Sequence, residues 1–226
     1  MKLIVFDCDG TLVDSQHMIV AAMDRAFVAS GLPAPRREHV LGVVGLSLMP
    51  AIGRLLPAAG YGALHRLAED YKLAFHDLRR TKRHQEPLYE GIRETITLLA
   101  AESGVLLGLA TGKSRRGVET VLEREGLRGC FHTVQTADTH PSKPHPAMIH
   151  AAMAEAGAEP RDTLMIGDTT FDMEMARAAG VTALGVAWGY HPADELVAAG
   201  AAAVVARSRD LSRAVLPYLS DEGRDR

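Results

Sequence analysis

The sequence predicts an α/β protein with a doubly wound parallel sheet and an all-helical insertion after the first strand. Short apolar, β-prone runs alternate with segments of helical periodicity from about residue 87 onward, a pattern typical of parallel strands joined by helices. Between residues 13 and 86, apolar positions recur at helical spacing and no strand is indicated. Polar residues follow the ends of the predicted strands, where Rossmann-like sheets bind their ligands. These patterns together support the predicted fold class.

The first predicted strand runs from Leu3 to Phe6, a short apolar run that we expect to be buried on both faces of the sheet. Asp7, Asp9 and Gly10 follow it, so that two carboxylates lie at the carboxyl end of this strand. Acids this close repel each other, and ionising both requires a cation or a shared proton. A Ca²⁺ loop also begins with such acids, but it needs a closing Glu about twelve positions from its start, which this chain does not supply. This stretch is therefore the first candidate site.

The segment between residues 13 and 86 predicts three helices, at about 15–30, 50–56 and 61–82. The first follows Asp14 or Ser15, either of which is a favoured N-cap residue, and ends at Gly31. A hinge of small and apolar residues at 43–48 precedes the second helix. A basic run at the end of the third helix is expected to face solvent, and it comprises Arg79, Arg80, Lys82 and Arg83.

Strands and helices alternate over the rest of the chain. The predicted strands lie at 105–110, 133–136, 163–166 and 181–186, with an edge strand at 202–205. The predicted helices lie at 91–102, 114–125, 147–156 and 171–179. Thr111 and Asp168 directly follow two of the strands, and Lys143 lies in a proline-flanked loop. Because the carboxyl ends of parallel strands meet at one edge of the sheet, we expect these residues to lie near Asp7 and Asp9.

The residues expected at this edge are Asp7, Asp9, Thr111, Lys143 and Asp168. Three carboxylates suit a hard cation, and Mg²⁺ binds through one or two carboxylates, waters and substrate phosphate. Thr111 and the backbone amides after it, at the start of a helix, suit an anion, and Lys143 supplies positive charge. An Asp beside both could attack phosphorus and form an aspartyl phosphate. Taken singly, Thr111 also suits a helix cap and Lys143 a solvated loop lysine.

Composition and charge narrow the class of protein. The 226 residues suffice for one or two domains, and 47% of them are hydrophobic, as in a globular protein. The formal net charge of −3 argues against a nucleic-acid or membrane binder, since either favours a basic surface. No signal peptide is visible, and no segment approaches the roughly 20 apolar residues that span a bilayer. Because Cys8 and Cys130 form no CxxC pair, we expect reduced thiols and a cytoplasmic location.

Four stretches, in chain order, resemble the motifs of the haloacid dehalogenase (HAD) superfamily. They are Asp7-Cys8-Asp9-Gly10-Thr11-Leu12, Thr111, Lys143 and Gly167-Asp168-Thr169-Thr170-Phe171-Asp172. The resemblance covers nearly the whole chain and is greatest to phosphoglycolate-phosphatase-like hydrolases, with the Ser-Lys-Pro-His-Pro stretch at 142–146 adding to it. It implies an α/β core domain formed by residues 1–12 and 87–226, and a helical cap domain formed by residues 13–86.

The resemblance also implies a catalytic role for four of the matching residues. Asp7 would be the nucleophile. Asp9 would protonate the leaving oxygen and then activate water for attack on the aspartyl phosphate. Thr111 would hydrogen-bond the phosphoryl group, and Lys143 would offset its negative charge.

Metal and substrate contacts follow from the same resemblance. The ligands of Mg²⁺ would be the carboxylates of Asp7 and Asp168 and the backbone carbonyl of Asp9. Asp172, one helical turn on, would support them, although the helix dipole also favours an acid at that position. The phosphate- and substrate-binding residues would be Gly10, Thr111, Gly112 and Lys143, together with Gly45 in the cap loop.

A few residues depart from the family pattern or lie outside it. Close relatives often have Asn where this chain has Gly112, which we expect to alter substrate contacts rather than competence. The cap offers no obvious cation for the leaving group. Cys8 is expected to be a buried small residue, because its acidic neighbours would raise the pKa of its thiol. Trp188 and Tyr190 follow a strand, and we expect them to pack rather than to line the rim of the site.

We expect an Mg²⁺-dependent phosphatase that hydrolyses a small phosphate monoester, such as phosphoglycolate or a sugar phosphate. A β-phosphoglucomutase-like mutase shares this scaffold, but such relatives tend to have Ser-Ala-Ser where Thr111, Gly112 and Lys113 stand. Dehalogenation is disfavoured because that chemistry does not need Asp9, and phosphonate hydrolysis because the cap shows no Schiff-base lysine. A receiver-like or non-catalytic phosphate-binding regulatory protein is the alternative from another class. The intact acids and the early helical insertion weigh against it. We expect a monomer or a dimer.

Overall fold

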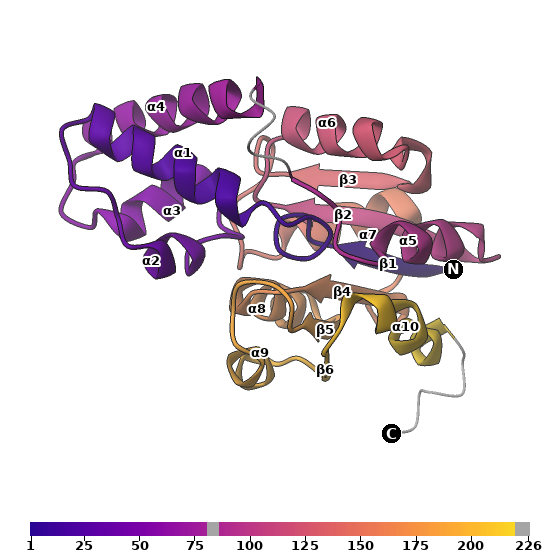
Figure 1. The fold of residues 1–226 in the computed structure, drawn as a ribbon. Coiled ribbons are helices and arrows are strands. Elements are labelled where there is room, and N and C mark those ends of the chain that lie inside the picture. The colour runs from indigo at the N-terminus through magenta and orange to yellow at the C-terminus, as the bar shows by residue number, and fades with distance from the viewer. Residues whose placement is uncertain (81–85, 220–226) are drawn as a thin grey trace.

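The computed structural model describes residues 1–80 and 86–219, which form a parallel sheet between layers of helices (Figure 1). Within these residues the sheet has six strands in the order β3-β2-β1-β4-β5-β6, all paired in parallel. The strands are β1 (Lys2–Phe6), β2 (Val105–Thr111), β3 (Thr133–Thr136), β4 (Thr163–Gly167), β5 (Thr182–Val186) and β6 (Ala203–Val205). This arrangement confirms the predicted doubly wound α/β class.

Strand β1 lies where the strand order reverses. Its neighbours are β2 and β4, so the chain reaches one edge of the sheet through β2 and β3 and the other through β4, β5 and β6. Open α/β sheets bind ligands outside the carboxyl ends of the strands at such a reversal. The stretch that begins at Asp7 therefore starts at the position in the sheet best suited to a site.

The helices of the described residues lie on both faces of the sheet and beyond its carboxyl end. They are α1 (Gln16–Ala29), α2 (Arg37–Leu41), α3 (Leu48–Leu55), α4 (Tyr61–Arg80), α5 (Ile92–Ala101), α6 (Arg115–Glu125), α7 (Ala147–Ala156), α8 (Thr170–Ala179), α9 (Ala193–Ala199) and α10 (Leu211–Leu219). The sequence patterns do not predict α2 and α9, because each buries only one side chain and so has no apolar periodicity. They do not predict α10, which contains Pro217, a residue that ordinarily ends or kinks a helix. None of the described helices is both long enough and apolar enough to cross a bilayer.

The side chains of β1 alternate between two apolar layers. Ile4 and Phe6 pack with residues of α5, α6 and α10 on one face of the sheet. Leu3 and Val5 pack with residues of α7, α8 and α9 on the other face. All four side chains are buried, as predicted for a strand covered on both faces.

Helices α1 to α4, the helical segment, form a separate group at the carboxyl end of the sheet (Figure 1). An apolar cluster that includes Met23, Phe27, Ile52 and Leu67 lies among them. In the described part of the chain between β1 and α5 there is no strand, in agreement with the sequence pattern. The helical segment therefore has an apolar cluster distinct from the two layers that cover the sheet.

The two connections between the helical segment and the sheet run side by side. The backbone N–H of Asp14 donates to the carbonyl of Pro87 at 2.8 Å, and that of Tyr89 donates to the carbonyl of Leu12 at 3.0 Å. Val13 and Leu88 form an antiparallel bridge between these two hydrogen bonds. The chain thus leaves and re-enters the sheet region through one short, hydrogen-bonded pair of segments.

Two expectations for the helical segment are wrong in detail. Of the two candidate caps of α1, Asp14 accepts a hydrogen bond from the backbone N–H of Gln16 at 3.4 Å. Ser15 occupies the N-cap position, but its hydroxyl lies 3.0 Å from the hydroxyl of Tyr190 and does not cap the helix. Arg79 does not simply face solvent, because its guanidinium pairs with the buried carboxylate of Glu86 at 2.6 Å. Both side chains find partners outside their own helix, which helical spacing alone does not reveal. Lys82 and Arg83 lie outside the described residues.

The buried layer next to β1 supports a direct stability test. Leu109 of β2 is fully buried, whereas Leu98 of α5 is 46% exposed. We expect Leu109→Ala to lower the free energy of unfolding by about 2–5 kcal/mol, because it leaves a cavity in a packed layer. The matched control Leu98→Ala should change it by less than about 0.5 kcal/mol. Urea unfolding measures both, and equal losses would contradict the packing described here.

Candidate active site

Asp7 stands at the carboxyl end of β1 with its side chain almost fully buried. Its backbone N–H continues the β1–β4 ladder by donating to the carbonyl of Ile166 at 2.9 Å. The register pairs Phe6 with Leu109, so that Asp7 and Thr111 emerge from neighbouring strands at the same edge. Asp168 follows β4 on the other side. The structure thus brings together the three strand ends that the sequence predicts to meet.

Lys143 joins two of the carboxylates. Its ammonium lies 2.8 Å from Oδ1 of Asp7 and 2.7 Å from Oδ1 of Asp172, and all three side chains are buried. Burial disfavours the charged form of Lys143, but the carboxylates of Asp172 and Asp7 outweigh that effect and raise the pKa of the amine above its ordinary value. Lys143 is therefore a buried cation held in place by two acids, and not a solvated loop lysine.

The acids at this edge carry more negative charge than Lys143 can balance. Burial raises the pKa of Asp7 to about 7, with Lys143 opposing the shift and Asp172 adding to it. Burial, followed by the charges of Asp7 and Asp172, also raises the pKa of Asp168 well above its ordinary value. A second cation in this space would relieve the repulsion and return these carboxyls to their charged forms.

The donor set fits a divalent cation. Oxygens of Asp7, Asp168 and Asp172 lie within 4.8 Å of one another. Among the described residues, no group hydrogen-bonds Oδ2 of Asp7, although this oxygen is buried. Carboxylate oxygens are the ligands that hard cations such as Mg²⁺ prefer. An unpartnered buried oxygen within a carboxylate cluster is the feature expected where such an ion binds.

Asp168 and Asp172 are both oriented by other groups. Asp168 accepts hydrogen bonds from the hydroxyl of Thr11 at 2.8 Å and the backbone N–H of Tyr190 at 3.0 Å. Asp172 accepts from the hydroxyl and the backbone N–H of Thr169 at 2.7 and 3.1 Å, forming a capping box at the start of α8. Asp172 is therefore an acid of the first helical turn, as the sequence suggests, and it is also a partner of Lys143, which the sequence does not indicate.

The turn after β1 passes close against Asp168, and Gly10 makes this possible. Its φ of +89° lies in the left-handed region that favours glycine. A Cβ at this position would also lie only 2.2 Å from Oδ2 of Asp168. Gly10 is therefore required by both the turn and the carboxylate beside it.

Asp9 points to residues that the sequence patterns do not single out as site residues. Its Oδ1 lies 2.8 Å from the ammonium of Lys113, which also lies 2.6 Å from Oε1 of Glu86. Burial disfavours the charged form of Lys113, but Asp9 and Glu86 outweigh it and raise the pKa of the amine. Burial opposes ionisation of Glu86, yet Lys113 and Arg79 lower the pKa of its carboxyl. In the sequence, the only indication of these ion pairs is that Lys113 lies two residues after Thr111.

The loop at residues 43–47, here called the covering loop, lies directly on the ends of β2 and β4. A Cβ at Gly112 would lie 2.7 and 2.6 Å from the backbone carbonyl oxygens of Gly45 and Leu46. A Cβ at Gly45 would lie 3.0 Å from the hydroxyl oxygen of Thr169. The backbone N–H of Ser47 donates to the hydroxyl of Ser142 at 2.9 Å. The covering loop thus approaches Gly112 too closely to leave room for a side chain there.

Thr111 is buried at the end of β2, and its hydroxyl accepts a hydrogen bond from the backbone N–H of Lys113 at 3.2 Å. It does not cap α6, because the hydroxyl of Ser114 does so by accepting from the N–H of Gly117 at 3.3 Å. The alternative prediction, that Thr111 caps the helix, is therefore wrong. The hydroxyl lies at the carboxyl edge of the sheet, next to the strand that carries Asp7.

Cys8 is buried, as expected, and the pKa of its thiol is raised well above its ordinary value. Burial is the larger cause, and the charge of Asp9 is the second, so the acidic neighbours are not the main reason. Trp188 donates from its indole N–H to the carbonyl of Thr11 at 3.0 Å. Together with the backbone of Tyr190 on Asp168, this contact supports the turn after β1 rather than lining an open rim.

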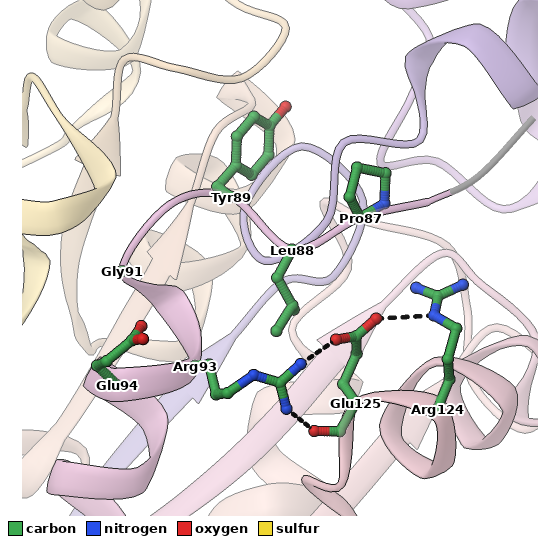
Figure 2. Close-up of a pocket in the computed structure, with 8 residues that line it drawn as sticks. All are labelled: Pro87, Leu88, Tyr89, Gly91, Arg93, Glu94, Arg124 and Glu125. Atoms are coloured by element: carbon green, nitrogen blue, oxygen red, sulfur yellow. Dashed lines mark hydrogen bonds and ion pairs between the residues drawn. The ribbon is translucent and has the colours of Figure 1, made fainter.

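A separate cavity of about 420 Å³ lies beside the return connection from the helical segment (Figure 2). It is lined by Pro87, Leu88, Tyr89, Gly91, Arg93, Glu94, Arg124 and Glu125. Arg93 and Arg124 both pair with Glu125 in Figure 2, so that the two guanidinium groups share one carboxylate. None of the predicted site residues lines this cavity.

Comparison with known proteins identifies relatives over nearly the whole chain. Residues 4–186 match the family described as haloacid dehalogenase-like hydrolase. The chain is 38% identical over 202 residues to the "Probable phosphatase IndB" of Dickeya dadantii, which covers 87% of this chain and 86% of that protein. It is 33% identical over 226 residues to the phosphoglycolate phosphatase of Pseudomonas putida, covering 97% of this chain and 80% of that protein. The crystal structure of a hydrolase from Pseudomonas syringae superimposes with a TM-score of 0.85 at 26% identity, over 97% of this chain and all of the other.

The raised pKa of Asp7 predicts how stability depends on pH in protein treated with a chelator. The carboxyl titrates near pH 3.8 when unfolded and near 7 when folded, so stability falls as pH rises through that window. Asp7→Asn cannot ionise, and it should raise the free energy of unfolding at pH 8 by at most about 4 kcal/mol, at about 1.4 kcal/mol for each pKa unit between 3.8 and 7. At pH 4 it should have little effect. Calorimetry with exposed Asp194→Asn as control tests this, and destabilisation by Asp7→Asn at pH 8 would contradict it.

The close approach at Gly112 predicts that an added side chain is not tolerated. Gly112→Ala should lower the free energy of unfolding by about 1–3 kcal/mol, because backbone atoms of the covering loop must move. Gly129→Ala is the matched control, since a Cβ there would have no atom of the described residues within 4 Å. Chemical denaturation of both variants measures the difference. Equal stabilities would show that the covering loop does not lie against Gly112.

Proposed function

The chain belongs to the haloacid dehalogenase-like hydrolases and is a phosphoric monoester hydrolase of that family. We propose that it uses Mg²⁺ to cleave a small phosphate ester, and that the reaction passes through an aspartyl phosphate on Asp7. The observation that carries this proposal is the environment of Asp7. One of its oxygens is held by Lys143 at 2.8 Å, and the other is buried with no partner among the residues that the structure describes. A carboxylate so oriented, at the reversal of strand order, suits an attack on phosphorus.

In the first step proposed, a carboxylate oxygen of Asp7 forms a bond to phosphorus as the bond from phosphorus to the ester oxygen breaks. Asp9 gives its proton to that leaving oxygen, which departs as an alcohol. In the second step, Asp9 takes a proton from water, whose oxygen attacks the phosphorus. The acyl phosphate bond breaks, phosphate leaves, and the carboxylate of Asp7 is restored. In this proposal Asp7 is the nucleophile, and Asp9 transfers the proton in both steps.

The phosphoryl group is bound, in this proposal, by groups that already surround Asp7. Lys143 offsets its negative charge, and the hydroxyl of Thr111 with the backbone at Gly112 provides hydrogen-bonding groups. The backbone N–H of Gly10, also predicted to bind phosphate, already donates to the carbonyl of Val13 at 2.9 Å, so the part left to Gly10 is the turn beside Asp168. Asp172 acts on Lys143, which it holds at 2.7 Å. The burial of these side chains keeps competing water from the reacting atoms.

The residues proposed to hold Mg²⁺ are Asp7, Asp168 and the backbone carbonyl of Asp9. The ion supplies compensation for the charge on the transferring phosphoryl group. Its binding would also relieve the repulsion among the buried carboxylates of Asp7, Asp168 and Asp172. In the described part of the chain, Lys143 is the cation that pairs with this cluster.

The substrate is proposed to be small, such as phosphoglycolate or a sugar phosphate. The name of the Pseudomonas putida relative supports the first of these. The covering loop, which includes Gly45, belongs to the proposed helical cap (residues 13–86) and would contact the leaving group, while residues 1–12 and 87–226 would form the core domain. A mutase that returns the phosphoryl group to a sugar would use the same residues. Cytoplasmic location and a monomeric or dimeric state stay predictions.

The nucleophile assignment predicts a loss of turnover that is specific to Asp7. Asp7→Asn should lower phosphate release from a panel of esters at least about 10³-fold in the presence of Mg²⁺, because an amide does not attack phosphorus. Asp9→Asn should accumulate enzyme carrying one added phosphoryl group, detected by mass spectrometry after acid quench. Asp194→Asn in α9 serves as control. Retained turnover in Asp7→Asn would contradict the proposal, and return of phosphate to a sugar substrate would favour the mutase.

The metal assignment predicts an effect on binding as well as on turnover. A chelator should stop phosphate release and added Mg²⁺ should restore it. Saturating Mg²⁺ should also raise the Tm of the wild-type protein by a few degrees, because it binds only the folded state. Asp168→Asn should abolish most of that rise. Turnover that survives chelation, or an equal rise in the variant, would contradict the metal site.

A further inference from the structure

A row of four charged side chains, here called the charge row, connects Asp9 to the end of helix α4. Lys113 bridges Asp9 and Glu86 at 2.8 and 2.6 Å, and Arg79 donates to the other oxygen of Glu86 at 2.6 and 3.2 Å. The side chains of Asp9, Lys113 and Glu86 are 12%, 7% and 1% exposed, and that of Arg79 is 26% exposed. The row alternates in sign and contains two acids and two bases. Because it is largely buried, removal of one member leaves an uncompensated charge.

The proposed chemistry assigns no task to Lys113 or Glu86. The ammonium that faces Asp7 is that of Lys143, and Lys113 reaches Asp9 instead. This pairing places the carboxylate of Asp9 in a single orientation, and the orientation depends on where the lysine is held.

Lys113 is held by the helical segment and by the return connection. Its ammonium lies 5.4 Å from the ring centroid of Phe75 in α4, and Arg79 lies over the same ring at 5.1 Å. Glu86 is fixed through its backbone as well, because the guanidinium of Arg124 in α6 donates to its carbonyl. Residue 86 directly precedes the hydrogen-bonded pair of connections at Pro87 and Tyr89. The position of the lysine thus depends on α4 and on the place where the chain returns to the sheet.

We propose that Lys113 is a positioning residue for Asp9, and that Glu86 sets the position of Lys113, so that placement of the helical segment determines the orientation of the catalytic acid and base. This inference rests on the proposed function, since it assumes that Asp9 transfers the proton. It assigns to Lys113 and Glu86 no contact with the substrate. The charge row then acts on the proton-transfer steps and not on the attack by Asp7.

The test compares Lys113→Met with Asp9→Asn and with the double variant. Lys113→Met should lower kcat for an alkyl phosphate about 100-fold with little change in KM, because a misplaced acid cannot protonate the leaving oxygen. In the Asp9→Asn background the same substitution should cost almost nothing more, since it acts through Asp9. Lys113→Arg should recover part of the loss. Lys72→Met, at an exposed lysine of α4, is the matched control.

An activated aryl phosphate separates the two chemical steps. Its leaving oxygen needs no proton, so Lys113→Met should release one burst of aryl alcohol at the wild-type rate and then turn over slowly. Asp7→Asn should show no burst. If Lys113→Met fails to fold, as judged by circular dichroism, the pair Glu86→Gln/Lys113→Met keeps the row neutral and carries the same expectations.

Two results would overturn the inference while leaving the proposed function intact. One is wild-type kcat for the alkyl ester in Lys113→Met or in the neutral pair. The other is a full additional loss when Lys113→Met is combined with Asp9→Asn, which would show that Lys113 acts independently of Asp9. Full turnover in Asp7→Asn or Asp9→Asn would instead overturn the proposed function itself.

Discussion

The pairing of Lys143 with Asp7 and Asp172 is the interaction on which the rest of the site depends. Three carboxyls meet in a buried space, and one ammonium at 2.7–2.8 Å from two of them is the nearest compensation. Burial of charge is unfavourable unless it is paired, and here the pairing is incomplete. The surplus of negative charge, visible in the raised pKa values of Asp7 and Asp168, leaves the folded chain ready to accept a cation.

Around this centre the fold supplies two further constraints. The covering loop lies so close to Gly112 that no side chain fits between them. This contact fixes the position of the helical segment over the strand ends. The charge row fixes the same segment from its other end, through α4 and Glu86. Both contacts join the helices to residues that flank the proposed chemistry. Movement of the helical segment would therefore be felt at Asp9 and at the phosphate-binding backbone together.

Much of this architecture was predictable from local pattern. The apolar run at Leu3 to Phe6 must lie inside a sheet, and the glycine and acids after it must lie at the edge, because alternation and turn chemistry act over a few residues. The same reasoning places Thr111 and Asp168. Local pattern does not predict helices such as α2 and α9, because each buries a single side chain and therefore shows no apolar periodicity. Ser15 has the sequence of a helix cap, but its hydroxyl faces a tyrosine 175 positions away.

The sequence by itself determined the fold class, the residues at the strand ends and the family. Each of these follows from short stretches of sequence, through their apolar periodicity or their motifs. Only the tertiary structure decided the partners of Asp9. Lys113 lies 104 positions from it along the chain, and Glu86, which holds Lys113, lies 77 positions away. They come together because β1, β2 and the return from α4 end at one point. Ion pairs of this kind depend on which segments the sheet order brings together, and no local pattern carries that information.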